Sequence, residues 1–509
     1  MSDSRFEMPY TYKSLLVCLG IIVVFVAALR FTHCHAIWGS FAFFLFCLAS
    51  KRWEFAFISF IVFNTLQLTC AELFEYGVSY SLVTKIAPFF FSAAGFFAAN
   101  KRNSRLSPFF SLLYIYMFWM MLVSLGGWAP IISELKAVFF LAFILAFIKG
   151  GELVLASGLE MGMTVRRVRA MMLAICSYYI LGSAVSYFIP SIGYSMMVRS
   201  VERYGGDWEN NISAGVGARL FSGITMHSQM LGPLMAILSA FLISDYLTNI
   251  RRKSWIHLVL ITTAPVLIYL SDSRTALGAY VLSIGAMVVF AMRSRAISNA
   301  RRSAFVSVVC AMGVAGIVAA AVVPQIREKV IQFVYKAEDI DSVEAQVSED
   351  GEAAWAGSRM PAVQQMWKNF KKRPWMGNGF QVNEFSQAYA DRGGLILSAP
   401  IEKGVLFVAV FEEGGFPGAI LFFAFIVAVY QKGFRSDCFC FLSVLTTILL
   451  CNLGEATFFS PSSSGGVCWA VCICSLLMDK ARLIRLAADG HVKAAYGCGL
   501  RTAYAGRGG

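Results

Sequence analysis

The amino-acid sequence predicts an all-α polytopic membrane protein with about 12 to 14 transmembrane helices and one large outer loop that contains helices. Of its 509 residues, 58% are hydrophobic and only 14% are charged. Its mean hydropathy is +0.66, whereas a soluble domain lies near or below zero. Apolar runs long enough to cross a bilayer recur from residue 14 to residue 478. This composition excludes a chain of soluble domains.

The candidate spans follow one another along the chain. They lie near residues 14–30, 36–50, 53–70, 82–99, 107–126, 134–149, 170–190, 221–247, 255–271, 275–292, 304–323, 404–431, 437–453 and 466–479. We interpret the first as a retained span and not as a signal peptide, because no small-residue cleavage site follows it. Most of the 13 cysteines lie inside these runs. We therefore expect Cys468, Cys472 and Cys474 to be packing residues and not metal ligands.

Lysine and arginine are concentrated in alternate connections. The basic connections contain Lys51-Arg52, Lys101-Arg102-Arg105, Arg166-Arg167-Arg169, Arg251-Arg252-Lys253, Arg293 to Arg302, and Lys432-Arg435. The connections 71–80, 127–133 and 454–465 contain neither residue. Because basic loops stay on the inside, both termini are predicted to be cytoplasmic. The net charge of +13 is then a topology signal and does not indicate nucleic-acid binding.

On this topology the chain divides into five predicted parts. Residues 1–190 are N-terminal transmembrane helices that serve as a scaffold, and residues 191–323 are a transmembrane core with the Arg219 and Arg274 motifs. Residues 324–403 form a large loop on the outer side, which is the periplasmic side if the membrane is a bacterial inner membrane. Residues 404–480 are C-terminal transmembrane helices with a re-entrant segment, and residues 481–509 are a cytoplasmic tail. No internal repeat is evident, which weighs against transporters built from inverted repeats.

The periplasmic loop is predicted to contain an amphipathic helix. Its apolar face carries Val363, Met366, Trp367 and Phe370. Its polar face carries Lys368, Lys371 and Lys372. Pro374 and the Gly377-Asn378-Gly379 turn end it. Such a helix can lie on the outer leaflet or cover a site between the spans, and a solvated loop with one helix is the alternative.

Charged residues beside or within apolar runs are functional candidates, because a charge at the centre of a membrane helix costs about 2.5–3.5 kcal/mol. Arg219 opens the eighth span, and His227 lies about two turns deeper. Arg274 lies between two apolar runs in Ser-Asp-Ser-Arg-Thr-Ala-Leu. The planar fork of arginine suits a diphosphate, because it donates two parallel hydrogen bonds. The alternative for these arginines is interfacial snorkelling.

Acidic residues mark two further places. Glu412 and Glu413 interrupt an apolar run just before Gly414-Gly415-Phe416-Pro417-Gly418. This glycine–proline cluster is expected to break the span, which is tolerated where the backbone faces protein or a wet cavity. Glu455 follows Asn452-Leu453-Gly454 at another outer edge. No Walker loop, dinucleotide fingerprint or HExxH motif is present, so we expect no metal and no cofactor.

Four segments together resemble the O-antigen ligase and polymerase superfamily. They are Arg219-Leu-Phe-Ser-Gly-Ile-Thr-Met-His-Ser-Gln-Met-Leu-Gly232, Ser271-Asp-Ser-Arg-Thr-Ala-Leu277, Ser358-Arg-Met-Pro-Ala-Val-Gln-Gln-Met-Trp367 with Pro374-Trp-Met-Gly-Asn-Gly-Phe380, and Glu412-Glu-Gly-Gly-Phe-Pro-Gly418. The resemblance covers roughly residues 210 to 430. The order of the segments and their common predicted side make the set fairly specific.

The resemblance implies a metal-independent, inverting glycosyltransferase of the membrane-embedded GT-C type that acts at the periplasmic face of the bacterial inner (cytoplasmic) membrane. Its donor is a glycan linked through diphosphate to undecaprenol. Its acceptor is the lipid A core for a ligase, or a second lipid-linked glycan for a polymerase. Membrane lipids are the remaining partners, and nucleic acid is not expected. Sugar identity and the choice between ligase and polymerase stay open.

In that scheme Arg219 and Arg274 hold the diphosphate and stabilise it as the leaving group. Further substrate-binding candidates are Arg359, Lys403 and His227. Supporting candidates are Glu412, Glu413 and Glu455.

The catalytic base is where the chain departs from the family. Ligases of this family carry a His-Asn pair just before the re-entrant segment, with the histidine as the proposed base. Here that place reads Ser398-Ala-Pro-Ile-Glu-Lys-Gly404, and residues 324–403 contain no histidine. Glu402 is the nearest group able to take a proton and is the predicted base, with a structural salt bridge as the alternative. The competing class of function is a transporter or flippase of lipid-linked or anionic substrates, which also uses arginines and intramembrane carboxylates.

Overall fold

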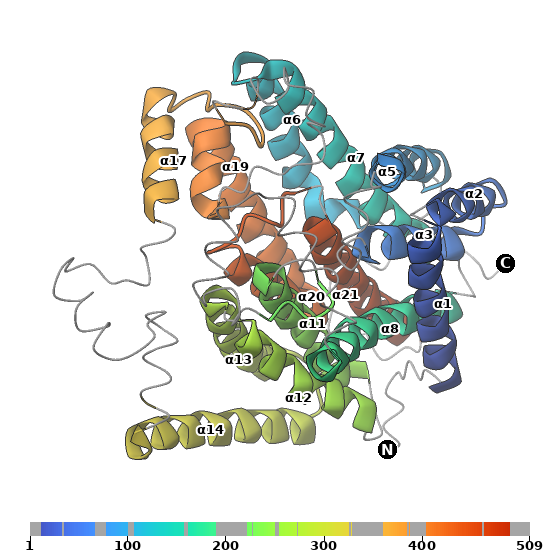
Figure 1. Cartoon of the computed structure of the whole chain (residues 1–509), viewed down its shortest axis with the longest axis vertical. Coiled ribbons are helices and arrows are strands. Elements are labelled where there is room, and N and C mark those ends of the chain that lie inside the picture. The colour runs from blue at the N-terminus through green and yellow to red at the C-terminus, as the bar shows by residue number, and fades with distance from the viewer. Residues whose placement is uncertain are drawn as a thin grey trace.

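The computed structural model describes most of the predicted spans and the helix of the outer loop. The described residues are 12–32, 35–66, 78–99, 106–156, 161–189, 221–225, 228–249, 254–271, 273–324, 327, 360–383, 386, 404–460 and 463–488. This part of the chain is built from helices and turns and contains no strand. Figure 1 shows the helices gathered into one bundle, with α14 and α17 at its edge.

The described residues of the N-terminal half of the bundle form eight helical elements. They are α1 (Tyr12–Phe31), α2 (Ala36–Ala49), α3 (Trp53–Leu66), α5 (Val78–Ala99), the 3-10 helix η2 (Ser107–Phe110), α6 (Ser111–Gly126), α7 (Pro130–Leu155) and α8 (Met161–Phe188). The C-terminal half follows. It consists of α11 (Ser228–Asn249), α12 (Trp255–Leu270), α13 (Arg274–Arg293), α14 (Asn299–Val322), α17 (Met360–Lys372), α19 (Leu406–Arg435), α20 (Phe439–Cys451) and α21 (Ser463–Ala488).

Helix length and composition confirm the fold class. Eight helices among the described residues are long and apolar enough to cross a membrane, and five shorter apolar helices accompany them. The number of these apolar helices agrees with the predicted 12 to 14 spans. The protein is therefore an all-α, multi-pass membrane protein.

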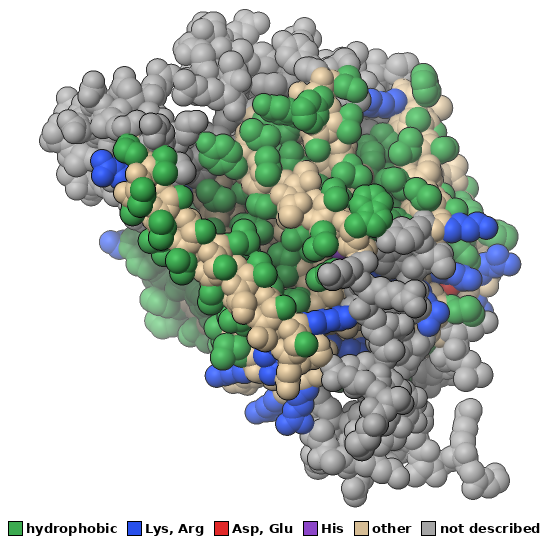
Figure 2. All heavy atoms as spheres, turned by 90° about the horizontal axis from the view of Figure 1, so that it is seen from below, with side chains coloured by type: hydrophobic (Ala, Val, Ile, Leu, Met, Phe, Trp, Pro, Cys, Tyr) green, Lys and Arg blue, Asp and Glu red, His purple; other side chains and the backbone are tan. Residues whose placement is uncertain are grey.

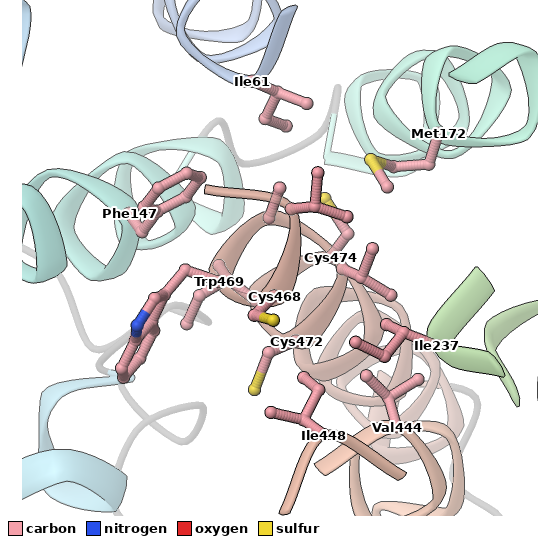
Figure 3. Packing of buried hydrophobic residues seen from close by; sticks show 14 of the residues in the cluster. Ile61, Phe147, Met172, Ile237, Val444, Ile448, Cys468, Trp469, Cys472 and Cys474 are labelled. Atoms are coloured by element: carbon pink, nitrogen blue, oxygen red, sulfur yellow. The ribbon is translucent and has the colours of Figure 1, made fainter. Parts of the chain in front are cut away.

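The core of the bundle surrounds α21. Figure 3 shows its residues Cys468, Trp469, Cys472 and Cys474 among side chains from several other helices. Those side chains are Ile61 of α3, Phe147 of α7, Met172 of α8, Ile237 of α11, and Val444 and Ile448 of α20. All are buried. The three α21 cysteines are free thiols in this core, where a thiol packs as a small apolar group.

The lipid-facing surface is the counterpart of this core. Figure 2 shows mainly hydrophobic side chains over the described part of one face, with lysine and arginine gathered toward its rim. α14 is an extreme case, because none of its apolar span is buried. A wholly exposed apolar helix is stable in lipid and not in water.

Arg169 is placed differently from its predicted position in a basic connection. α8 begins at Met161, so Arg169 lies within the helix and is buried. Its guanidinium donates two hydrogen bonds of 2.8 Å to the carboxylate of Asp245 on α11. Nε2 of His257 on α12 lies 3.2 Å from the same carboxylate. The prediction was wrong because a bidentate pair neutralises the arginine inside the bundle, which the charge count along the sequence does not reveal.

The basic ends of two helices lie side by side. Arg293 ends α13, and its guanidinium lies 6.0 Å from the ring centroid of Phe434 near the end of α19. The backbone N–H of Arg295 also donates to Asp437, just beyond α19, at 3.2 Å. We call this the basic end of the bundle. The stretch of α19 from Phe416 to Arg435 is about 28 Å long at about 1.5 Å per residue, close to the bilayer core of about 30 Å.

Candidate functional site

The segments singled out in the sequence lie at the opposite end of the bundle, which we call the motif end. It comprises the start of α11, the start of α13, the Asn452–Glu455 turn after α20, and the Gly415 kink of α19 with the turn that follows α17. α13 contains 20 residues, so Arg274 lies about 30 Å from the basic end. The motif end and the basic end therefore lie at opposite ends of the candidate spans α13 and α19.

The start of α13 is packed closely against α11. A Cβ atom added at Gly232 would lie 2.6 Å from Cβ of Ser273 and 2.7 Å from Oγ of Ser271. Ser273 caps α13, because its Oγ accepts from the backbone N–H of Ala276 at 3.4 Å. Arg274 is the first residue of the helix and is half-buried. Arg274 therefore belongs to the positive end of a helix dipole, where anions are favoured.

A second turn covers the same helix start. A Cβ atom added at Gly454 would come 2.4 Å from Oγ1 of Thr275, so Glu455 belongs to a turn in contact with the residue after Arg274. The carbonyl oxygen of Asn452 accepts from the backbone N–H of Leu406 at 3.1 Å. This bond ties the turn to the start of α19. The 271–277 segment, the Glu455 turn and α19 are thereby connected.

The glycine turn after α17 docks on the kink of α19. Pro417 has no N–H, so the carbonyl oxygen of Glu413 lacks its usual helical donor, and the N–H of Gly379 supplies one at 3.1 Å. The N–H of Phe416 donates at 2.8 Å to the carbonyl of Pro374, and that of Asn378 donates at 2.9 Å to the carbonyl of Glu412. The predicted break in the span is confirmed, and the outer-loop turn satisfies the backbone groups that the break exposes.

Glycine is required where the two segments touch. Gly377 and Gly415 both have φ of +65°, a left-handed conformation that other residues rarely adopt. A Cβ atom at Gly377 would lie 2.2 Å from the carbonyl oxygen of Glu413, and one at Gly415 would lie 2.7 Å from that of Pro374. The backbones approach too closely for any side chain at either position.

The carboxylates of the kink bind the outer-loop segment. Oε1 of Glu412 accepts from Nδ2 of Asn369 on α17 at 2.8 Å. Oε1 of Glu413 accepts from the backbone N–H of Gln381 at 3.1 Å. Both glutamates are buried. The predicted amphipathic helix is confirmed as α17, with Met366 and Phe370 on its buried face.

Lys136 is a residue of this site that the sequence reasoning missed. It lies in the second turn of α7, is only 4% exposed, and donates from Nζ to the carbonyl of Gln381 at 2.9 Å. Gln381 is thus held between a buried cation and the Glu413 carboxylate, with a φ of +50° that is unusual for a non-glycine residue. A lysine at the edge of an apolar run was the available signal.

Five of the predicted site residues lie outside the described residues. They are Arg219, His227, Arg359, Glu402 and Lys403. The structure places the other four, Arg274, Glu412, Glu413 and Glu455, at the motif end. Gly232, the last residue of the segment that begins at Arg219, also lies at the motif end.

The fold and this geometry define a multi-pass membrane protein whose charged and glycine-rich segments lie at one end of the helical bundle. Residues 256–423 match the family model described as O-antigen ligase. The match includes the segments at 271–277, 358–380 and 412–418, and it confirms the resemblance to the O-antigen ligase and polymerase superfamily. No curated protein matches the chain. The match supports glycosyl transfer of the ligase or polymerase type, and nothing in it favours a transporter.

Proposed function

We propose that the protein transfers a glycan from an undecaprenyl-diphosphate-linked donor to an acceptor hydroxyl at the periplasmic face of the inner membrane. The observation that carries the proposal is that the three family segments lie at one end of the bundle, where the Asn452–Glu455 turn links the start of α13 to the start of α19. A lipid-linked donor presents its diphosphate at a membrane boundary, with its polyprenyl chain in the bilayer. The motif end, about one bilayer core from the basic end, fits such a donor.

Arg274 is the group that we assign to the diphosphate. Departure of the diphosphate leaves negative charge on its oxygens, which a guanidinium and the N-terminus of α13 stabilise. A bidentate arginine–phosphate pair also fixes the leaving group in place. We assign Arg219 to the same diphosphate, and Arg359, Lys403 and His227 to further substrate contacts.

The buried glutamates have a supporting part in this scheme. Glu412 and Glu413 hold α17 and the glycine turn on α19, which fixes the end of the outer loop nearest the membrane. Glu402 precedes α19 by four residues and is our candidate for the base that takes the proton of the acceptor hydroxyl. Attack by that oxygen on the anomeric carbon expels the diphosphate and inverts the configuration.

The test uses the full chain in detergent with an undecaprenyl-diphosphate glycan and two acceptors, a lipid A core and a second lipid-linked glycan. Release of undecaprenyl diphosphate with a longer lipid-linked glycan would identify a polymerase. Release with glycan on the lipid A core would identify a ligase. Arg274→Ala is expected to lower the rate at least 100-fold, since removing one such stabilising group commonly costs 10²–10³-fold. Release that is unaffected by Arg274→Ala would contradict the assignment.

A further inference from the structure

The surface around α17 carries aromatic and basic side chains that the proposed reaction does not use. Rings connect α17 to the kink of α19 in a continuous row. The centroid of Trp367 lies 5.0 Å from that of Phe370, Phe370 lies 5.0 Å from Phe416, and Phe416 lies 5.9 Å from Trp375. Phe370 is buried and anchors the row.

The outer members of this row are exposed. Trp367 is 44% exposed, Trp375 68% and Phe416 42%, and Met376 beside them is also exposed. Lys368, Lys371 and Lys372 of α17 are exposed too. We call these seven residues the aromatic–basic surface. In Figure 1, α17 lies alongside α19 at the edge of the bundle.

The length of α19 indicates how deep in the membrane the aromatic–basic surface lies. Phe416 lies about 28 Å from Arg435 along the helix, which is one bilayer core from the basic end. α19 is itself a candidate span. The row of rings therefore lies at the membrane–water boundary, where tryptophan is favoured because its ring is apolar and its N–H is polar. Lys368 follows Trp367 in α17, and Lys371 and Lys372 end that helix shortly before Trp375, so these exposed lysines accompany the rings.

From this combination we infer that the aromatic–basic surface binds the headgroups of anionic membrane lipids at the boundary of the motif end. The exposed rings insert among the lipid chains just below the headgroups, and the lysines contact the phosphates above them. The contact holds α17, and with it the turn on Glu412 and Glu413, at a fixed depth. The inference depends on α19 spanning the membrane and does not depend on glycan transfer.

The test places the full chain in lipid nanodiscs that contain a small, equal fraction of either brominated phosphatidylglycerol or brominated phosphatidylcholine. Bromine near the headgroup end of the acyl chain quenches tryptophan fluorescence at short range. The contribution of Trp375 is the difference between the wild-type protein and Trp375→Phe. We expect both lipids to quench this contribution, and the anionic lipid to quench it more strongly.

We attribute the stronger quenching by the anionic lipid to the three lysines. In the variant Lys368→Gln/Lys371→Gln/Lys372→Gln, the preference for phosphatidylglycerol is expected to vanish while quenching by phosphatidylcholine remains. A juxtamembrane lysine changes the preference for an anionic lipid on the order of fivefold, so three lysines should give a large difference in quenching. Salt at 0.5 M should reduce this difference, because it shortens the Debye length to about 4 Å. The matched control Lys51→Gln/Arg52→Gln removes exposed basic residues of another connection and should leave the preference unchanged.

Two results would overturn the inference. If neither lipid quenches Trp375, the surface does not meet the bilayer. If the two lipids quench it equally in the wild-type protein, the rings are an anchor without recognition of anionic headgroups. Neither measurement requires a donor, an acceptor or turnover, so a failure here is distinct from a failure of the proposed glycan transfer.

Discussion

Asn378 donates its backbone N–H to the carbonyl oxygen of Glu412 at 2.9 Å, which joins the turn after α17 to the kink of α19. The two residues are distant in the sequence, and each belongs to a segment shared with the O-antigen ligase family. The turn uses the backbone groups that Pro417 and Gly415 release from the helix. The two segments therefore act as one structural unit, and a change that separates them should affect both.

Gly377→Ala tests this unit. The added methyl group would collide with the backbone of Glu413, at a residue with φ of +65°. We expect a loss of at least about 1–3 kcal/mol in the free energy of unfolding, seen as a lower thermal midpoint in detergent. The control is Gly278→Ala in α13, where a Cβ atom meets nothing within 4 Å. That change should be neutral or raise stability by about 0.5–1 kcal/mol. Equal effects of the two substitutions would show that the turn is not docked.

Arg169 and Asp245 should be strongly coupled. Removing either partner leaves a buried charge without its counter-ion, so Arg169→Met or Asp245→Leu is expected to cost about 3–5 kcal/mol. The double variant removes both charges and should cost clearly less than the sum of the two. Denaturant or thermal unfolding of all four proteins gives the coupling free energy. Additive effects would mean that the ion pair contributes nothing to folding.

Lys136→Met should loosen the segment after the glycine turn. The substitution keeps the length of the side chain but removes the donor to the carbonyl of Gln381. A buried carbonyl that loses a charged donor costs about 1.5–3 kcal/mol. The thermal midpoint of the variant is compared with that of Lys51→Met, an exposed lysine that should change stability by less than about 0.5 kcal/mol. A Lys136 variant as stable as this control would contradict the role that we give to the lysine.

The sequence predicted the all-α membrane fold, α17 and the break at Gly415, because each depends on local composition or on the period of apolar residues. The bond between Asn378 and Glu412 could not be predicted, since it depends on how two distant segments pack. Arg169 and Lys136 were missed for a related reason. Charge counting treats a basic residue as exposed, whereas each of these two has a partner on another element.

Glu402→Gln tests the assignment of the base. Glutamine is close in size to glutamate but accepts no proton, so transfer should fall by about 10²–10⁴-fold while binding of the lipid-linked donor persists. Donor binding is measured directly, with a labelled undecaprenyl-diphosphate glycan. Turnover near the wild-type rate would remove Glu402 from the mechanism. Loss of both binding and turnover would indicate the structural salt bridge instead.

Gly454→Ala should disturb the proposed diphosphate site through a neighbour of Arg274. The new methyl group would lie 2.4 Å from Oγ1 and 2.5 Å from Cγ2 of Thr275, so the start of α13 has to shift. We expect weaker binding of the donor, by about tenfold, because small displacements of a binding group are costly. Thr275→Ala removes both of the atoms in closest conflict and leaves Cβ at 2.9 Å. In the Gly454→Ala background it should therefore restore much of the affinity. Thr275→Ala alone serves as the control. If the double variant binds the donor no better than Gly454→Ala, the close approach of this turn to α13 does not govern the position of Arg274.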